Sequence, residues 1–86
     1  MEIVMIKKQG CMPCEQFEPE ARKIAEENNI GFRIIPEEIM PPKMKPPFFP
    51  YFHLMDGKDL LESWGGVKDR KFLSVIKRNK KKKDEE

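Results

Sequence analysis

The sequence has no long hydrophobic run, and its longest aliphatic stretch is the four residues Ile3 to Ile6. A membrane-spanning helix needs about 20 apolar residues, so we expect no membrane span and no membrane partner. The acidic Glu2 directly before this stretch is unlike the start of a signal peptide. Two cysteines are too few for a disulfide-stabilised secreted scaffold. These absences predict a small soluble protein in the reducing cytoplasm.

The chain has 86 residues, enough for one domain with a modest core. Its basic residues are concentrated near the end, because residues 77–83 contain six of the 17. Without residues 77–86, eleven basic and twelve acidic residues remain, a net charge of −1. A domain with no excess of positive charge is not expected to bind nucleic acid. We interpret residues 1–79 as the domain and residues 80–86 as a solvated charged tail; nucleic-acid binding through the tail is the alternative.

Hydrophobic periodicity predicts a strand, a helix and a second strand in the first half of the chain. Residues 3–7 suit a short strand buried on both faces. Residues 11–28 predict an amphipathic helix, with Gly31 just past its end and a second strand at residues 32–35. A strand, a helix and a strand in this order are typical of a parallel βαβ unit. The apolar face of the helix consists of Phe17, Ala21, Ile24 and Ala25.

Proline dominates the middle of the chain, because six of the eight prolines lie between positions 36 and 50. Proline removes a backbone donor and disfavours helix in the residue before it. Residues 37–49 are therefore expected to hold little regular helix beyond one turn at residues 37–40.

The last third predicts a β-hairpin followed by a helix. Residues 51–55 and 58–63 read as strands around an Asp56-Gly57 turn. A final helix is expected from about Val67 or Asp69, with Asp69 as the N-cap candidate, toward Asn79. The residues on its predicted apolar face are Phe72, Leu73 and Ile76.

The strongest chemical signal is Cys11-Met12-Pro13-Cys14, at the predicted start of the first helix. Two thiols at i and i+3 on a first helical turn are close enough to form a disulfide. The helix N-terminus stabilises a thiolate at Cys11 and can lower the pKa of a cysteine there from ~8.5 to ~7. Cys11 would then attack a disulfide, and the more buried Cys14 would resolve the mixed disulfide.

Two other interpretations of this cysteine pair stay open at this point. A closed zinc site usually needs four protein ligands, and the chain offers two cysteines and one histidine, His53. Two inert core cysteines are the other alternative. We expect His53 to be structural and assign it no catalytic role.

Residues 11–25 resemble the active-site helix of thioredoxins, in which a proline precedes the second cysteine and another proline, here Pro19, follows it five residues later. Phe49-Pro50, with the strand and turn after it, is similar to the cis-proline, strand and hairpin of the same family; Pro47 is the fallback choice. The resemblance covers about residues 2–79. It implies an α/β, minimal thioredoxin-like fold: a mixed four-stranded sheet, built as βαβ–ββα and flanked by helices.

Other residues are similar to glutaredoxins. Lys8 stands three residues before Cys11, where many glutaredoxins carry a lysine near the thiolate, although a solvated Lys8 is equally compatible with the sequence. The Gly65-Gly66 segment ending in Asp69 is similar to their glutathione-holding segment. Two positions depart from the thioredoxin pattern: Gly10 replaces a tryptophan, and Met5 replaces a buried acid used there as a proton acceptor.

The resemblance implies an enzyme, a thiol–disulfide oxidoreductase that reduces protein disulfides through Cys11 and Cys14 and needs no cofactor or metal. Its expected electron donor is a thioredoxin-reductase-type enzyme or glutathione, and it is expected to act as a monomer. The alternatives are a glutathione-dependent, glutaredoxin-like protein and a non-catalytic module that binds a metal or a protein. Trp64 is either a groove residue or an ordinary core aromatic. The expected substrate-binding residues are Met12, Pro13, Phe49, Pro50, Trp64, Gly65 and Gly66, with Lys8 stabilising the thiolate.

Overall fold

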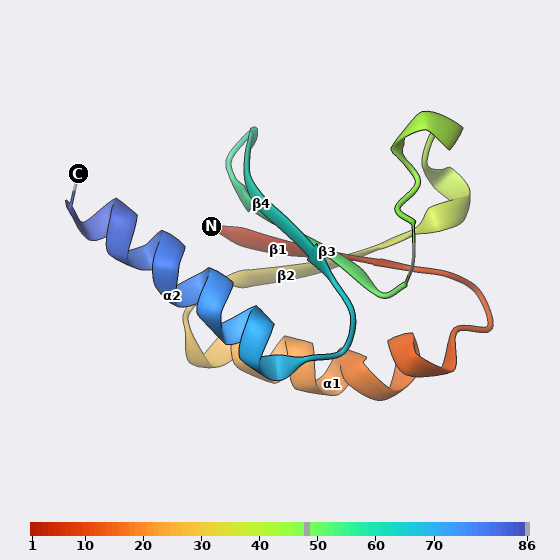
Figure 1. Cartoon of the computed structure of the whole chain (residues 1–86), viewed down its shortest axis with the longest axis horizontal. Helices are drawn as coiled ribbons and strands as arrows, with labels where there is room; N and C mark the ends of the chain where they lie inside the picture. Colours follow the sequence, from red (N-terminus) through yellow and green to blue (C-terminus); the bar gives the residue numbers. More distant parts are fainter. Residues whose placement is uncertain (48, 86) are drawn as a thin grey trace.

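A mixed four-stranded sheet forms the centre of the molecule (Figure 1). The computed structural model describes residues 1–47 and 49–85, with side chains up to Lys80. The strand order is β2-β1-β3-β4. β1 pairs parallel with β2 and antiparallel with β3, and β3 pairs antiparallel with β4, which confirms the βαβ unit and the hairpin. The strands are β1 (Glu2–Lys7), β2 (Gly31–Pro36), β3 (Tyr51–Asp56) and β4 (Asp59–Gly65).

Both α-helices, α1 (Met12–Glu27) and α2 (Asp69–Glu85), lie on the same face of the sheet (Figure 1). Their apolar side chains form one buried cluster with the strand residues that point toward them. β-Strand residues alternate between faces, so this cluster uses Ile3 and Met5 from β1 and Phe52 and Leu54 from β3. The predicted apolar face of the first helix is buried as expected.

On the opposite face of the sheet, the described residues form only short helical turns. The 3-10 helices η1 (Glu37–Ile39) and η2 (Pro42–Met44) follow β2 and confirm that the proline-rich segment holds little regular helix. Met40 and Met44 from this segment line an apolar hollow with strand residues such as Val4. β1 is buried on both faces, because each of its residues from Ile3 to Ile6 is at most 4% exposed.

Two predicted turns are shifted along the chain. Asp56 pairs with Asp59, so the hairpin loop is Gly57 and Lys58 instead of Asp56 and Gly57. Gly57 supplies the positive φ of this turn, +63°. After α1, the left-handed residue is Asn29, with φ +57°, and Gly31 already belongs to β2. Asparagine tolerates this conformation because its short polar side chain bonds locally.

The last helix differs from its prediction in three ways. Leu73 is 45% exposed and is not part of the apolar face, whereas Val75 is fully buried and takes that place. Asp69 is the first helical residue, and its Oδ1 accepts a hydrogen bond from the backbone N–H of Arg70 at 2.9 Å. The helical backbone also continues through Glu85, past the end expected at Asn79. The side chains of the charged segment from residue 81 onward, and all of residue 86, lie outside the described residues.

No helix within the described part of the chain is both long enough and apolar enough to cross a bilayer.

Candidate active site

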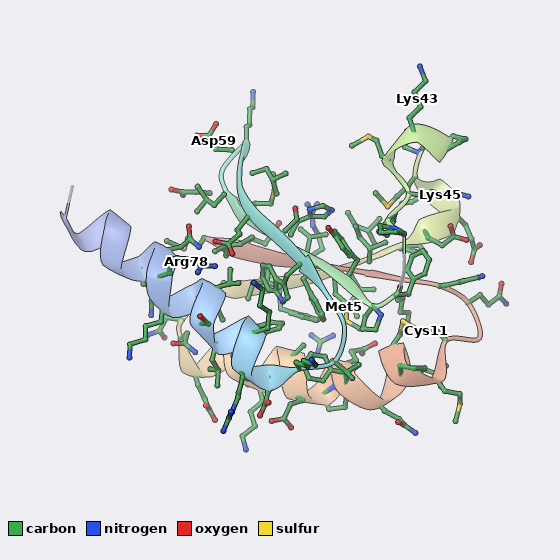
Figure 2. The ribbon with its side chains drawn as sticks, viewed as in Figure 1. Met5, Cys11, Lys43, Lys45, Asp59 and Arg78 are labelled. Carbon is green, nitrogen blue, oxygen red and sulfur yellow. A yellow bond between two sulfur atoms is a disulfide. The ribbon has the colours of Figure 1, made fainter. Side chains whose placement is uncertain are left out.

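Cys11 is the N-cap of α1, where β1 passes through a short loop into the helix (Figure 2). Its backbone is extended, with φ −82° and ψ 101°, and its Sγ accepts a hydrogen bond from the backbone N–H of Cys14 at 3.2 Å. The first N–H groups of a helix have no intrahelical partners, so they point toward a sulfur at this position. The positive end of the helix dipole also faces that sulfur. The same contact would stabilise a Cys11 thiolate. The side chain is half-buried, which leaves it reachable from solvent.

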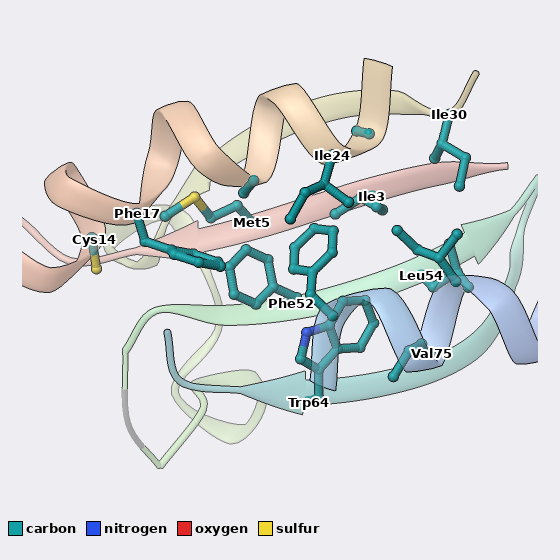
Figure 3. Packing of buried hydrophobic residues seen from close by; sticks show 14 residues of the cluster. Ile3, Met5, Cys14, Phe17, Ile24, Ile30, Phe52, Leu54, Trp64 and Val75 are labelled. Atoms are coloured by element: carbon teal, nitrogen blue, oxygen red, sulfur yellow. The ribbon is translucent and has the colours of Figure 1, made fainter. Parts of the chain in front are cut away.

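Cys14 lies one turn further along α1 and is fully buried at the end of the apolar cluster (Figure 3). A disulfide joins Cys11 and Cys14, with their Cα atoms 5.2 Å apart. Between them, Met12 is 62% exposed and Pro13 is also exposed, which places both at the surface where a partner can touch them. The cysteine pair therefore has one accessible sulfur and one protected sulfur, as the sequence predicted.

The strand register brings three predicted site segments to the same end of the sheet, where β1 ends and β3 begins. Ile6 pairs with Tyr51, so the Phe49-Pro50 peptide lies beside the end of β1 that leads to Cys11. Tyr51 also pairs with Gly65, which brings the glycine pair to the same end. The Phe49-Pro50 bond is cis, as the resemblance implied, and Pro50 is buried.

The Pro50 carbonyl accepts a hydrogen bond from the Gly66 N–H at 2.9 Å, so the proline loop and the glycine loop are joined directly. Gly66 has φ +100°, a conformation that side-chain-bearing residues rarely adopt. Phe49 is half-buried and packs against the core cluster.

The loop before Cys11 explains one departure from the thioredoxin pattern. Gly10 has φ +77°, which a tryptophan or any other L-residue would adopt only with strain. The carbonyl of Lys8 accepts a hydrogen bond from the Cys11 N–H at 3.1 Å and fixes the loop. The Lys8 side chain is exposed and lines a hollow of about 200 Å³ with Gly10, Glu15 and Glu38, among others. Its expected role at the thiolate stays a prediction.

Trp64 lies in the core and is only 4% exposed. Its ring stacks on Phe52 with centroids 5.6 Å apart and meets Phe72 edge-on at 5.3 Å. Its indole Nε1 is buried without a hydrogen-bond partner among the described residues. A ring this enclosed offers almost no surface to a substrate. Trp64 is therefore a core aromatic and does not line a substrate groove.

His53 lies on the sheet face opposite the α-helices. Its Nδ1 is 2.7 Å from Ser63 Oγ, and burial lowers the pKa of the imidazole below its usual 6.5. The half-buried ring is held on the sheet by this contact, and its structural role stays a prediction. Within the described residues, no group of three or more His, Cys, Asp or Glu side chains could hold a metal ion.

The sheet order, the helix-start disulfide and the cis proline together define a thioredoxin-like fold. No protein-family model and no curated protein matches the sequence. Among solved structures, thioredoxin 1 from Thermosipho africanus superposes with a TM-score of 0.82 at 20% identity and covers 98% of this chain and 99% of its own. Chlamydomonas reinhardtii thioredoxin f2 has a TM-score of 0.77 at 22% identity, covering 90% and 76%. Fasciola hepatica thioredoxin also has a TM-score of 0.77, at 21% identity, covering 88% and 77%. These TM-scores show that the fold is shared.

The sequence interpretation missed one charged pair near the cysteines. Lys7 Nζ lies 3.4 Å from Glu18 Oε1 and ties the end of β1 to α1. Glu18 also lies 3.7 Å from Arg22 through its second oxygen. The sequence positions could have indicated this pair. Glu18 follows Cys14 by one helical turn, and Lys7 lies two residues after Met5, on the same side of β1.

Proposed function

We propose that the protein is a thiol–disulfide oxidoreductase that reduces protein disulfides. The observation that carries this proposal is the disulfide between the half-exposed N-cap Cys11 and the fully buried Cys14. Only a pair with this asymmetry gives one sulfur that meets a substrate and one that stays protected until it is needed. The thioredoxin-like fold is consistent with the same reaction.

The reaction begins with the dithiol form. The Cys11 thiolate, stabilised by the N-terminus of α1, attacks one sulfur of a substrate disulfide and releases the other as a thiolate. Cys14 then attacks Cys11 Sγ, which forms the Cys11–Cys14 disulfide and releases the second substrate sulfur. Two electrons pass from the protein to the substrate, and the released thiolates take up the two protons that the dithiol loses.

Phe49 and the Gly65-Gly66 loop are the proposed surface for the substrate chain, and Pro50, which is buried, positions them instead of meeting the substrate itself. They adjoin the end of β1 that leads to Cys11, and the bond from Gly66 to Pro50 holds the two loops together. Met12 and Pro13 extend this surface on the helix side.

For the electron donor we propose either a thioredoxin-reductase-type enzyme or glutathione, and for the compartment a reducing cytoplasm. The compartment rests on the low cysteine content, and the glutathione alternative on Lys8 and the segment from Gly65 to Asp69. Recharging the oxidised protein with each donor separately distinguishes the two.

The proposal is tested by equilibrating the protein with glutathione buffers of stepped potential and trapping free thiols at each step. We expect a midpoint potential near or below about −230 mV, typical of a reductant. A midpoint between about −180 and −120 mV would indicate an oxidase or isomerase instead. If no intramolecular disulfide forms at any potential, the exchange mechanism is wrong. Metal retained stoichiometrically after purification would then favour the binding-module alternative.

A further inference from the structure

The second step of the proposed reaction requires that Cys14 lose a proton, because the thiolate is the nucleophile in disulfide exchange. Cys14 is fully buried, and its cluster is built from apolar residues such as Met5, Phe17 and Phe52 (Figure 3). Burial in apolar surroundings disfavours a charged sulfur. Among the described residues, no ionisable side chain other than the cysteine itself is buried in the core. A proton acceptor for Cys14 must therefore lie at the margin of the cluster.

Glu18 is the carboxylate at that margin. It follows Cys14 by four residues on α1, and side chains at this spacing lie on the same face with Cβ atoms about 5–6 Å apart. Its side chain is 28% exposed, so most of it is shielded from solvent. Lys7 points to the same side of the sheet as Met5 and holds Glu18 Oε1 at 3.4 Å.

The other charged groups near this point are arranged differently. Arg22 Nη2 lies 3.7 Å from the other Glu18 oxygen, Oε2, and the Arg22 side chain is 50% exposed. Glu15 and Lys8 are both exposed and line the hollow in front of the loop at Gly10. On the side of β3 and its preceding loop, the cluster presents Phe52 and Phe49, which carry no charge.

We propose that Glu18 is the general base that accepts the Cys14 proton; this inference rests on the proposed function. In the mixed disulfide, the Cys14 proton moves to the Glu18 carboxylate, directly or through one water, as Cys14 Sγ attacks Cys11 Sγ. The new Cys11–Cys14 bond forms, the bond from Cys11 to the substrate sulfur breaks, and the substrate leaves as a thiolate. Glu18 then returns its proton to that thiolate or to solvent.

The test uses the full chain in its reduced form and an aromatic disulfide, 5,5′-dithiobis(2-nitrobenzoate), whose released thiolate is coloured. The first equivalent of colour reports the attack by Cys11, and the second reports resolution by Cys14. We expect Glu18→Gln to leave the first phase unchanged and to slow the second about 10- to 100-fold at pH 7, at or somewhat below the usual contribution of general-base catalysis. The deficit should shrink as the pH rises, because the Cys14 thiol then ionises without help.

Lys7→Gln is the matched variant, since it breaks the same ion pair and keeps the carboxylate. We expect its second phase to stay within about threefold of the unmodified protein, and Glu18→Asp to recover part of the lost rate. A second phase that Glu18→Gln leaves unchanged, or that Lys7→Gln slows equally, overturns the inference. An unchanged first phase shows that the site is still folded. If the unmodified protein releases no second equivalent, the proposed function fails instead.

Discussion

Cys11 and Cys14 stand three residues apart and occupy opposite environments. Cys11 caps a helix and receives a backbone N–H on its sulfur, whereas Cys14 is enclosed by the core. Electrostatics at the cap favour charge on the first sulfur, and desolvation disfavours it on the second. The order of attack in the proposed reaction follows from this difference alone.

Serine variants test that order. Cys14→Ser should still attack a substrate disulfide but should accumulate a stable mixed disulfide, because nothing displaces the substrate from Cys11. Cys11→Ser should form at most traces of mixed disulfide, since Cys14 is buried. Mass spectrometry of the two variants after exposure to a disulfide-bonded protein measures the adducts. Equal adduct formation by both variants would contradict the assignment.

At the scale of elements, β4 and α2 are joined by a polar clamp. Glu62 on β4 accepts hydrogen bonds from Arg78 through both carboxylate oxygens and from Asn79 Nδ2 at 3.2 Å. Asn79 is itself buried, with its amide also bonded to the Val75 carbonyl at 2.8 Å. The clamp fixes α2 against the sheet beyond the last turn that the aromatic core reaches.

The clamp predicts a pH dependence of stability. Burial alone would raise the pKa of Glu62, but hydrogen bonds from Arg78 and Asn79 and the nearby positive charges outweigh it and lower the pKa below 4.5. Ionised Glu62 therefore stabilises the folded state above pH 4.5, and this contribution is lost as the pH falls through the lowered pKa.

The measurement is urea unfolding of the unmodified protein and Glu62→Gln between pH 7 and pH 3. We expect the variant to be less stable at pH 7 by no more than about 1 kcal/mol, since Arg78 is about half exposed and solvent weakens the pair, and the stability difference to narrow in acid. Glu2→Gln is the control, because Glu2 forms an exposed ion pair with Arg33, at 3.2 Å, outside the clamp. If the stability difference between the two proteins widened below pH 4.5, the expected direction of the pH dependence would be wrong.

At the scale of the whole molecule, four aromatic rings bring the helices and the sheet together. Phe52 on β3 lies 5.8 Å from Phe17 on α1, 5.0 Å from Phe72 on α2 and 5.6 Å from Trp64 on β4, measured between ring centroids. Each ring comes from a different element, so their packing couples all four elements in one cooperative unit. In a chain of this length such a cluster is a large part of the buried apolar surface.

Two adjacent residues on α2 test this coupling. Phe72→Ala should lower the free energy of unfolding by about 3–5 kcal/mol, a large fraction of the about 5–15 kcal/mol available to a domain. Leu73→Ala should cost less than about 1 kcal/mol, because Leu73 is 45% exposed. Thermal unfolding followed by circular dichroism measures both. Similar losses at the two positions would mean that the core does not include Phe72 in the way described.

Much of this molecule could be predicted from short-range patterns. The first helix, the strands and the proline-rich turn follow from spacing and backbone chemistry, which depend on a few neighbouring residues. The cysteine pair at the helix start follows from the same local signals. The error on the last helix is not local in origin: Leu73 and Val75 are both apolar on the same helix, and only the position of the sheet decides which one is buried.

The sequence by itself determined that Cys11 and Cys14 lie on one helical turn, because a helix fixes the positions of residues three apart. Only the tertiary structure decided what surrounds them. The register Ile6–Tyr51–Gly65 brings the cis proline and the glycine loop to the end of the sheet beside Cys11, and Lys7 meets Glu18 across 11 residues. The same packing encloses Trp64 and removes it from the surface. These contacts join residues far apart along the chain, so they exist only once the sheet and the helices have packed together.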